Sequence, residues 1–181
     1  MSTVKYQIQF FSNWHCGSGL SAGADVDALC IKDSEGIPYV PGRTIKGLLR
    51  DASTFLFGSE NSKMNAIMGI SGSDTNHAPG CAFFTNATFP NEEKALMVSR
   101  DLASHLFQTF ASTAIDDEGI AKDNTLRKIE TVVPCILVGE ILNVPDDESV
   151  IKMIDDALRY IKRLGLGRNR GFGRCEISII K

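Results

Sequence analysis

Residues 164–174 constrain this chain more than any other segment, because four glycines and three arginines lie there between two regular elements. An apolar face with helical period precedes the segment (149–163), and a strand pattern follows it (175–180). Glycines let main-chain N–H groups approach a ligand, and arginines donate paired hydrogen bonds to phosphate oxygens. A dinucleotide site has the reverse order, with the strand before the glycines and the helix after them. The order disfavours a nucleotide cofactor and favours a nucleic-acid backbone; the alternative is an ordinary glycine turn with solvated arginines.

The composition indicates one soluble domain in a reducing compartment. The chain has 181 residues, of which 43% are hydrophobic, and it contains neither an apolar run that spans a bilayer nor a secretory signal. Its five cysteines are widely spread and never form a CxxC pair, which favours neither a disulfide framework nor a zinc site. We therefore expect a cytoplasmic protein with no membrane partner.

The charge pattern suits a protein that binds RNA as part of an assembly. A net charge of −3 counts against an independent nucleic-acid binder. The basic residues nevertheless gather in three segments, 43–50, 122–128 and 159–174, while acids gather at 116–118 and 146–148. An acidic subunit with a local basic groove could bind RNA within an assembly, because neighbouring subunits would help to neutralise the phosphates.

Hydrophobic periodicity predicts an α+β fold. Apolar residues alternate from Val4 to Phe10, as in a strand with one buried face, and a helical face begins after Thr44, which is the expected N-cap. With the helix and strand at the C-terminal end, the order is compatible with a ferredoxin-like βαββαβ core that is enlarged in the middle. The remaining expectations are a loop at 15–25, a connection at 59–80, a core strand at 81–89, a short helix at 101–110, a loop at 111–124, and one long or two short strands at 126–142 with a break at Pro134.

Three side chains in the loop after the first strand are candidates for chemistry. Asp25 and Asp27 lie among small residues, where carboxylates serve in acid/base catalysis or bind a hard cation, although such acids are more often solvated. His15 is a candidate general base or base-stacking group, or else a buried packing residue. A nucleophilic pair of His15 with Cys16 is disfavoured, because neighbours on a strand point to opposite faces.

Three segments together resemble the RAMP superfamily of CRISPR-associated proteins. They are HCGSGL (15–20) running into IPYVPGRTIKGLLR (37–50); Ala114, Ile115 and Asp116 with Gly119, Ala121, Leu126, Arg127 and Glu130; and GLGRNRGFGR (165–174). Within the superfamily the chain most resembles the backbone subunit of type III interference complexes, which coats the guide RNA. The resemblance implies a single domain over 1–181, similar to an RNA-recognition motif, with a thumb-like hairpin inserted within 59–130 and formed around 115–127.

The resemblance also implies an activity, cofactors and partners. Asp27 matches the position that cuts target RNA, where it would either hold a metal or take the 2′-OH proton, and Asp25 is the second choice. The implied reaction needs a divalent cation such as Mg²⁺ or Mn²⁺, and the implied partners are CRISPR RNA, complementary target RNA, other type III subunits and further copies of this chain. The residues that would bind RNA are His15, Arg43, Thr44, Lys46, Arg50, Arg127, Gly165, Gly167, Arg168, Asn169, Arg170, Gly171, Gly173 and Arg174.

Two alternatives stay open within the same superfamily. One is a subunit that binds guide RNA and its neighbours without cutting. The other is an endoribonuclease that processes the guide precursor, which would depend on a histidine such as His15. The chain is short for the family and acidic for an RNA-coating subunit.

Overall fold

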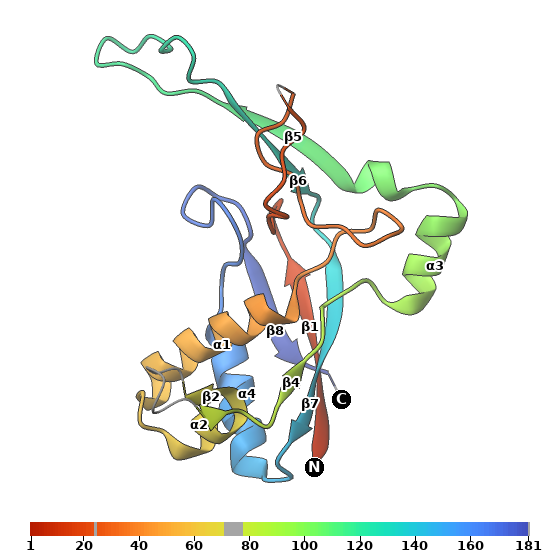
Figure 1. The fold of residues 1–181 in the computed structure, drawn as a ribbon, viewed down its shortest axis with the longest axis vertical. Helices are drawn as coiled ribbons and strands as arrows, with labels where there is room; N and C mark the ends of the chain where they lie inside the picture. The colour runs from red at the N-terminus through yellow and green to blue at the C-terminus, as the bar shows by residue number, and fades with distance from the viewer. Residues whose placement is uncertain (24, 71–77, 181) are drawn as a thin grey trace.

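The core is a four-stranded antiparallel sheet with two helices on one face (Figure 1). The computed structural model describes residues 1–23, 25–70 and 78–180. The strands lie in the order β4–β7–β1–β8, with bounds of Phe83–Phe84, Ile136–Val144, Ser2–Phe10 and Cys175–Ile179. Helices α1 (Gly42–Phe57) and α4 (Glu148–Tyr160) pack against each other and against the sheet.

The chain order β1–α1–β4–β7–α4–β8 confirms the ferredoxin-like α+β fold. The alternation predicted for the first strand decides which face is buried: Tyr6 and Ile8 face the helices, and the polar residues between them face the other side. Helix α4 buries Ile154 and Leu158 against the sheet and begins after Asp147, whose carboxylate accepts a hydrogen bond from the Ser149 N–H at 2.8 Å.

Helix α1 begins two residues before the predicted N-cap, so the assignment of Thr44 was wrong. Pro41 is the N-cap residue and has no side-chain cap. The Asn86 side chain supplies the cap instead, since its Oδ1 accepts a hydrogen bond from the Gly42 N–H at 3.0 Å. A cap that comes from another segment leaves no local pattern in the sequence.

Two predictions in the region 59–89 need correction. The connection contains helix α2 (Ser62–Met68), whose N-cap Asn61 accepts from the Met64 N–H, and a short pair of strands, β2 (Gly69–Ile70) and β3 (Ala78–Pro79). The predicted core strand at 81–89 is reduced to the two residues of β4, followed by single bridges at Ala87 and Thr88. The pairing is interrupted because Ala87 pairs with Val40 just before α1, whereas Thr88 pairs again with Val138 of β7.

The short helix predicted at 101–110 was also wrong. Helix α3 (Asn91–Ser99) ends earlier, a 3₁₀ turn covers Ala103–Leu106, and strand β5 (Phe107–Ser112) follows. Strand β5 pairs with β6 (Arg127–Val132), so long-range pairing overrides the local helical period, and the predicted loop at 111–124 begins only after Ser112. Strands β6 and β7 are separate, as in the two-strand version of the prediction.

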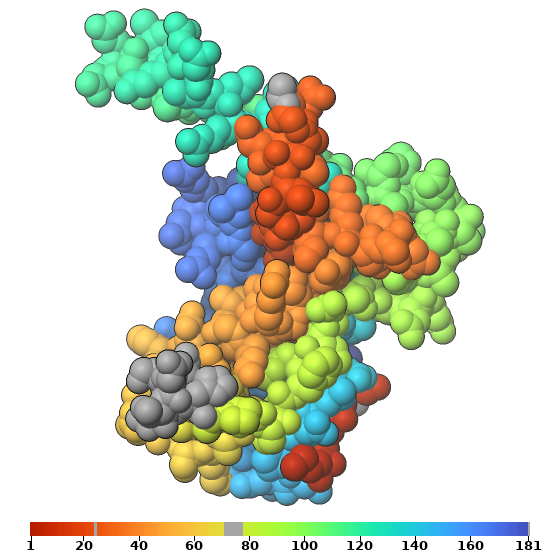
Figure 2. Space-filling model, in the orientation of Figure 1, coloured from red at the N-terminus to blue at the C-terminus, as the bar shows by residue number. Residues whose placement is uncertain are grey.

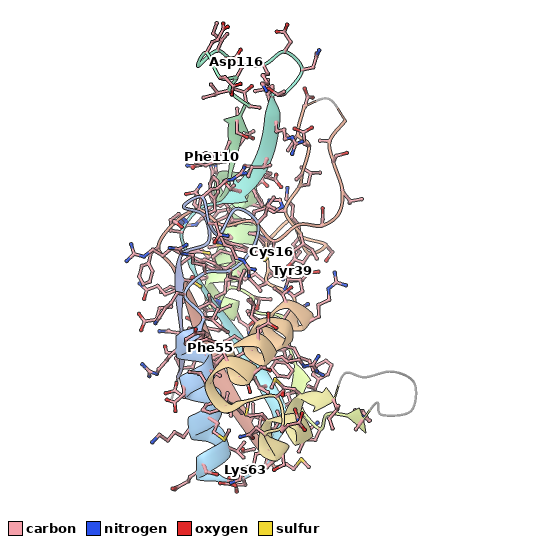
Figure 3. The ribbon with its side chains drawn as sticks, turned by 90° about the vertical axis from the view of Figure 1, so that its left-hand side faces the viewer. Cys16, Tyr39, Phe55, Lys63, Phe110 and Asp116 are labelled. Carbon is pink, nitrogen blue, oxygen red and sulfur yellow. The ribbon has the colours of Figure 1, made fainter. Side chains whose placement is uncertain are left out.

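The β5–β6 hairpin stands away from the sheet (Figures 1 and 2). Its tip includes Asp116, which lies far from the helices in Figure 3, and Phe110 lies lower on the same hairpin. This hairpin corresponds to the thumb-like hairpin in the predicted fold class. None of the helices in the described part of the chain has the length and apolar composition needed to cross a bilayer.

Gly139→Ala is expected to lower the free energy of unfolding by about 1–3 kcal/mol, because a methyl group there overpacks the core. Gly139 lies directly opposite the fully buried Tyr6, and an added Cβ would lie 2.5 Å from the tyrosine Oη. Urea denaturation measures the change. The matched control is Gly47→Ala on the exposed side of α1, where nothing lies within 4 Å and alanine raises helix propensity. Equal stabilities of the two variants would contradict the packing of Tyr6 on Gly139.

Candidate nucleic-acid interface

The loop that carries Asp27 is fixed to strand β6. The Asp27 N–H donates to the Lys128 carbonyl at 2.8 Å, and the Lys128 N–H donates to Asp27 Oδ2 at 2.7 Å. Ala28 then bridges Ile129 in parallel, and its carbonyl accepts from the Glu130 N–H at 3.0 Å. Asp27 is exposed, and among the described residues no donor lies within hydrogen-bond distance of its Oδ1. Asp25 is also exposed and makes a backbone bond to Ala22. The carboxylate of Asp27 is therefore held at a fixed place with one oxygen available.

Glu130 also anchors this loop to β6, through the residues that follow Asp27. Its Oε2 accepts from the Cys30 N–H at 2.9 Å, and its Oε1 lies 2.8 Å from the Lys32 ammonium. Its backbone carbonyl accepts from His15 Nδ1 at 2.6 Å. The Glu130 side chain is only 13% exposed, so screening by solvent is weak there. The sequence offered Glu130 only as part of a resemblance, without a role.

His15 lies inside the protein and does not present a ring to a base. It is 1% exposed, and because a carbonyl only accepts hydrogen bonds, Nδ1 must carry a proton toward Glu130. The Cys30 thiol lies 3.4 Å from the same nitrogen, and burial raises its pKa to about 12. Cys16, the next residue along the chain, is buried as well. His15 and Cys16 therefore do not lie one on a buried face and one on an exposed face. The structure gives His15 the packing role that the sequence left open.

The glycine–arginine loop lies against the segment that follows β1. The Leu166 N–H donates to the His15 carbonyl at 2.9 Å, and the Gly173 N–H donates to the Asn13 carbonyl at 2.7 Å. At Gly165 an added Cβ would lie 2.3 Å from the His15 carbonyl oxygen, at a φ of 92°. At Gly173 it would clash with the Leu164 carbonyl oxygen, at a φ of 67°. Gly165 is therefore needed for the close approach of the two segments, and Gly173 for the close turn within the glycine–arginine loop itself.

The arginines of the loop are on its outer side. Arg168, Asn169 and Arg170 are exposed in the turn, where the Arg170 N–H donates to the Gly167 carbonyl. Arg163 donates to the Arg168 carbonyl at 3.2 Å and supports this turn. Between Arg159 and Arg174 there are six cations and no acid, in a chain whose net charge is −3. The loop therefore concentrates positive charge on one side of the molecule.

A hollow of about 460 Å³ lies where the two loops meet. Its lining combines Asp27 and Leu29 from the loop after β1 with Leu166 from the glycine–arginine loop. In Figure 2 the segment after β1 (orange-red) and the glycine–arginine loop (blue) lie side by side. Phe172 of the glycine–arginine loop also meets Phe110 of β5 edge to face, with 5.0 Å between ring centroids. Asp27 thus lies in a hollow between the two loops, and the hairpin contacts the glycine–arginine loop through Phe110.

The predicted RNA-binding residues at the start of α1 form a separate group. Arg43 is exposed, Thr44 is half-buried, and the Lys46 ammonium lies 5.9 Å from the centroid of the Phe84 ring. Arg50 donates to the carbonyls of Met68 and Gly69 at 2.7 and 3.4 Å, so its guanidinium caps the end of α2.

The other predicted RNA-binding residue outside the loops is on the hairpin. Arg127 is exposed and is the first residue of β6, where it pairs with Ser112. Neither Arg127 nor the start of α1 lines the hollow at Asp27.

The chain does not provide a complete metal cage in the described residues. Within 1–23, 25–70 and 78–180, no three His, Cys, Asp or Glu side chains gather into a site for a cation. Mg²⁺ in phosphoryl-transfer sites is commonly held by one or two carboxylates, with substrate phosphates and water completing its coordination. Asp27, with Oδ1 available, fits the part of a single protein ligand.

Comparison with known proteins identifies the family. The RAMP superfamily model matches residues 7–176, and the chain therefore belongs to the RAMP superfamily. A chain in the cryo-EM structure of the type III-B Cmr-beta complex bound to cognate target RNA is similar, with a TM-score of 0.77 and 12% identity over 99% of this chain and 97% of that chain. A chain of the apo state of Cmr-beta gives a TM-score of 0.73 and 14% identity, again over 99% and 97%. No curated protein matches the sequence.

The family match confirms the RAMP superfamily that the sequence resemblance predicted. At 12–14% identity the two structural matches concern the fold.

Proposed function

We propose that this chain is a CRISPR RNA-binding subunit of a type III effector complex and that it cuts target RNA paired with the guide. Its partners are the guide, the complementary target, other subunits of the complex and further copies of itself. One observation carries the proposal: the glycine–arginine loop lies directly against the loop that holds Asp27, around one hollow. A phosphate-binding element and a fixed carboxylate are thereby adjacent, although they come from opposite ends of the chain.

The binding half of the proposal rests on charge and on exposed main chain. The cations of 159–174 neutralise phosphates, while the exposed turn at 168–171 lets donors approach the backbone of a strand. Arg43 and Lys46 extend the contact at the start of α1. Contacts of this kind do not read bases, so Watson–Crick pairing with the guide selects the target.

The cutting half of the proposal assigns the chemistry to Asp27. The 2′-hydroxyl oxygen of the target attacks the adjacent phosphorus, and the P–O5′ bond breaks. The products are a 2′,3′-cyclic phosphate and a 5′-hydroxyl, so the proton lost from O2′ is balanced by one gained at O5′. The protein's main contribution is to hold the strand in line for attack. Asp27 Oδ1 is placed either to accept the 2′-OH proton or to bind the cation.

A divalent cation such as Mg²⁺ or Mn²⁺, when bound, would stabilise the charge that develops on the phosphate oxygens. Asp27 is the residue of this chain that would hold it. Water and the phosphates of the RNA would complete the coordination.

A guide-processing endoribonuclease is the less favoured function. It needs a histidine general base that reaches the RNA, and His15 is only 1% exposed. A subunit that binds RNA without cutting shares every binding feature described above. Substitution of Asp27 separates it from the cutting subunit.

Neutralising the two exposed arginines of the turn tests RNA binding. The double variant Arg168→Gln/Arg170→Gln is expected to bind a single-stranded RNA at least about tenfold more weakly, since charge-assisted hydrogen bonds are lost. Fluorescence anisotropy at several salt concentrations measures it, and the slope of log K against log salt should fall by about 0.7 for each lost phosphate contact. The control Arg100→Gln/Lys152→Gln makes the same change of charge at two exposed positions, one directly after α3 and one on α4. Equal weakening by both pairs would refute a local binding site.

A further inference from the structure

A second hollow, of about 390 Å³, shares no residue with the hollow at Asp27. It lies where the end of β1, the start of β8 and the segment after α4 come together. Its lining contains one aromatic ring, three cations and one acid: Phe11, Lys162, Arg163, Arg174 and Glu176, with the buried Cys175 between the last two. The proposed function gives Phe11 no role, and it uses Lys162 and Arg163 only as part of the general positive charge of 159–174.

The alternation of β1 turns Phe11 outward. Phe10 is buried and stacks on Trp14, with 4.6 Å between ring centroids, so its neighbour Phe11 points to the opposite side and is 46% exposed. The backbone of Phe11 is fixed, because its N–H donates to the Arg174 carbonyl at 2.8 Å. The Arg174 N–H in turn donates to Ser12 Oγ at 3.0 Å. An exposed aromatic ring on a rigid backbone is a ready stacking surface.

The cations around this ring are held by the same backbone pairing. The Cys175 N–H donates to the Lys162 carbonyl at 3.0 Å, and Arg163 bridges Arg174. The Arg174 guanidinium lies 5.7 Å from the centroid of the Phe11 ring. Glu176 is the single acid of the lining, so the hollow carries a net positive charge.

The side chains that line this hollow favour single-stranded nucleic acid over a protein partner. The core of a protein interface is depleted in charged residues, whereas the residues around Phe11 in this lining are mostly cations. Aromatic rings among lysines and arginines are the usual means of binding single-stranded nucleic acid, with bases on the rings and phosphates on the cations.

We propose that this hollow binds one nucleotide of single-stranded RNA, with the base stacked on Phe11 and the adjoining phosphates on Lys162 and Arg163. The inference rests on the proposed RNA-binding function and adds a stacking position to it. The bonded segments 13–15 and 164–173 connect the two hollows, since Asn13 and His15 accept hydrogen bonds from the glycine–arginine loop. An RNA strand that follows this loop passes from Phe11 toward Asp27.

Phe11→Leu tests the stacking position in the full-length protein. Anisotropy with a fluorescein-labelled, unstructured single-stranded RNA is expected to show binding about 5- to 150-fold weaker than wild type, the usual effect of removing one stacking side chain. The slope against salt concentration should stay unchanged, because no phosphate contact is lost. Phe11→Trp should retain the affinity, and its added indole fluorescence should be quenched by RNA. The matched control is Phe83→Leu, which alters another exposed ring, on β4.

The outcomes separate this inference from the proposed function. If the wild-type protein binds no RNA, both fail. If it binds RNA and the Arg168→Gln/Arg170→Gln variant weakens binding while Phe11→Leu does not, the stacking position alone is wrong. If Phe11→Leu leaves RNA binding intact but abolishes self-association in sedimentation, the hollow binds protein, which also overturns the inference.

Discussion

Asp27→Asn is expected to slow the cutting of paired target RNA by at least about 100-fold, while guide binding stays at the wild-type level. The loss follows from either proposed role, because an amide neither accepts the 2′-OH proton nor binds a hard cation well. Removal of an acid/base group commonly costs a factor of 10² to 10⁴. Single-turnover cleavage of labelled target by a reconstituted complex measures the effect.

Asparagine is the informative substitution at this position. Its side-chain carbonyl still accepts the Lys128 N–H bond that Asp27 Oδ2 accepts at 2.7 Å, so the loop keeps its place. The neighbouring exposed acid provides the control Asp25→Asn. Removal of divalent cations with a chelator should stop cleavage by the wild type, and added Mg²⁺ or Mn²⁺ should restore it.

Two results would contradict the assignment. If the Asp25 variant loses cleavage and the Asp27 variant keeps it, the second-choice carboxylate is the functional one. If both variants cut at the wild-type rate, the cutting group lies elsewhere and this chain is the non-catalytic RAMP subunit.

Gly173→Ala is expected to lower the free energy of unfolding by roughly 3–5 kcal/mol and to weaken RNA binding as well. The added Cβ would clash with the backbone carbonyl of Leu164, and alanine would also have to adopt a φ of 67°. A residue with a side chain pays about 1–3 kcal/mol for such a backbone, and overpacking adds about as much. The clash lies within the loop, so the loop must change its conformation next to its bond with Asn13, which displaces its arginines.

Gly171→Ala is the matched control for the clash. Gly171 also has a positive φ, of 93°, but nothing lies within 4 Å of its added Cβ. Gly171→Ala should therefore lower the free energy of unfolding only by the cost of the positive φ, about 1–3 kcal/mol. Urea denaturation and RNA anisotropy on both variants give the comparison. Equal losses would show that the contact of Gly173 with Leu164 does not hold the loop in place.

The elements that could be predicted from the sequence are those whose burial follows a simple period. Strand β1 and helix α4 each bury one regular face, and the pattern is visible without any partner. Helix α3 was missed because it has no buried residue, so no apolar face marks it. Strand β5 was taken for a helix because most of its residues are exposed and only its pairing with β6 defines it.

The sequence indicates candidate residues for the site but not their arrangement. The glycine and arginine content of 164–174 pointed to phosphate without a structure, and the resemblance pointed to Asp27. What the sequence could not provide is that the two loops contact each other, since this depends on bonds between residues about 150 positions apart, such as Leu166 to His15. The anchoring by Lys128 and Glu130, the burial of His15 and the capping of α2 by Arg50 have the same long-range origin.

Ultraviolet crosslinking of the reconstituted complex, followed by mass spectrometry of the peptides attached to RNA, tests the central claim most directly. The account predicts crosslinks in the two segments that contact each other, residues 11–27 and 163–174, and their loss from the second segment in Gly173→Ala. Crosslinks confined to other surfaces, such as helix α3 or the tip of the hairpin, with none in either segment, would contradict it.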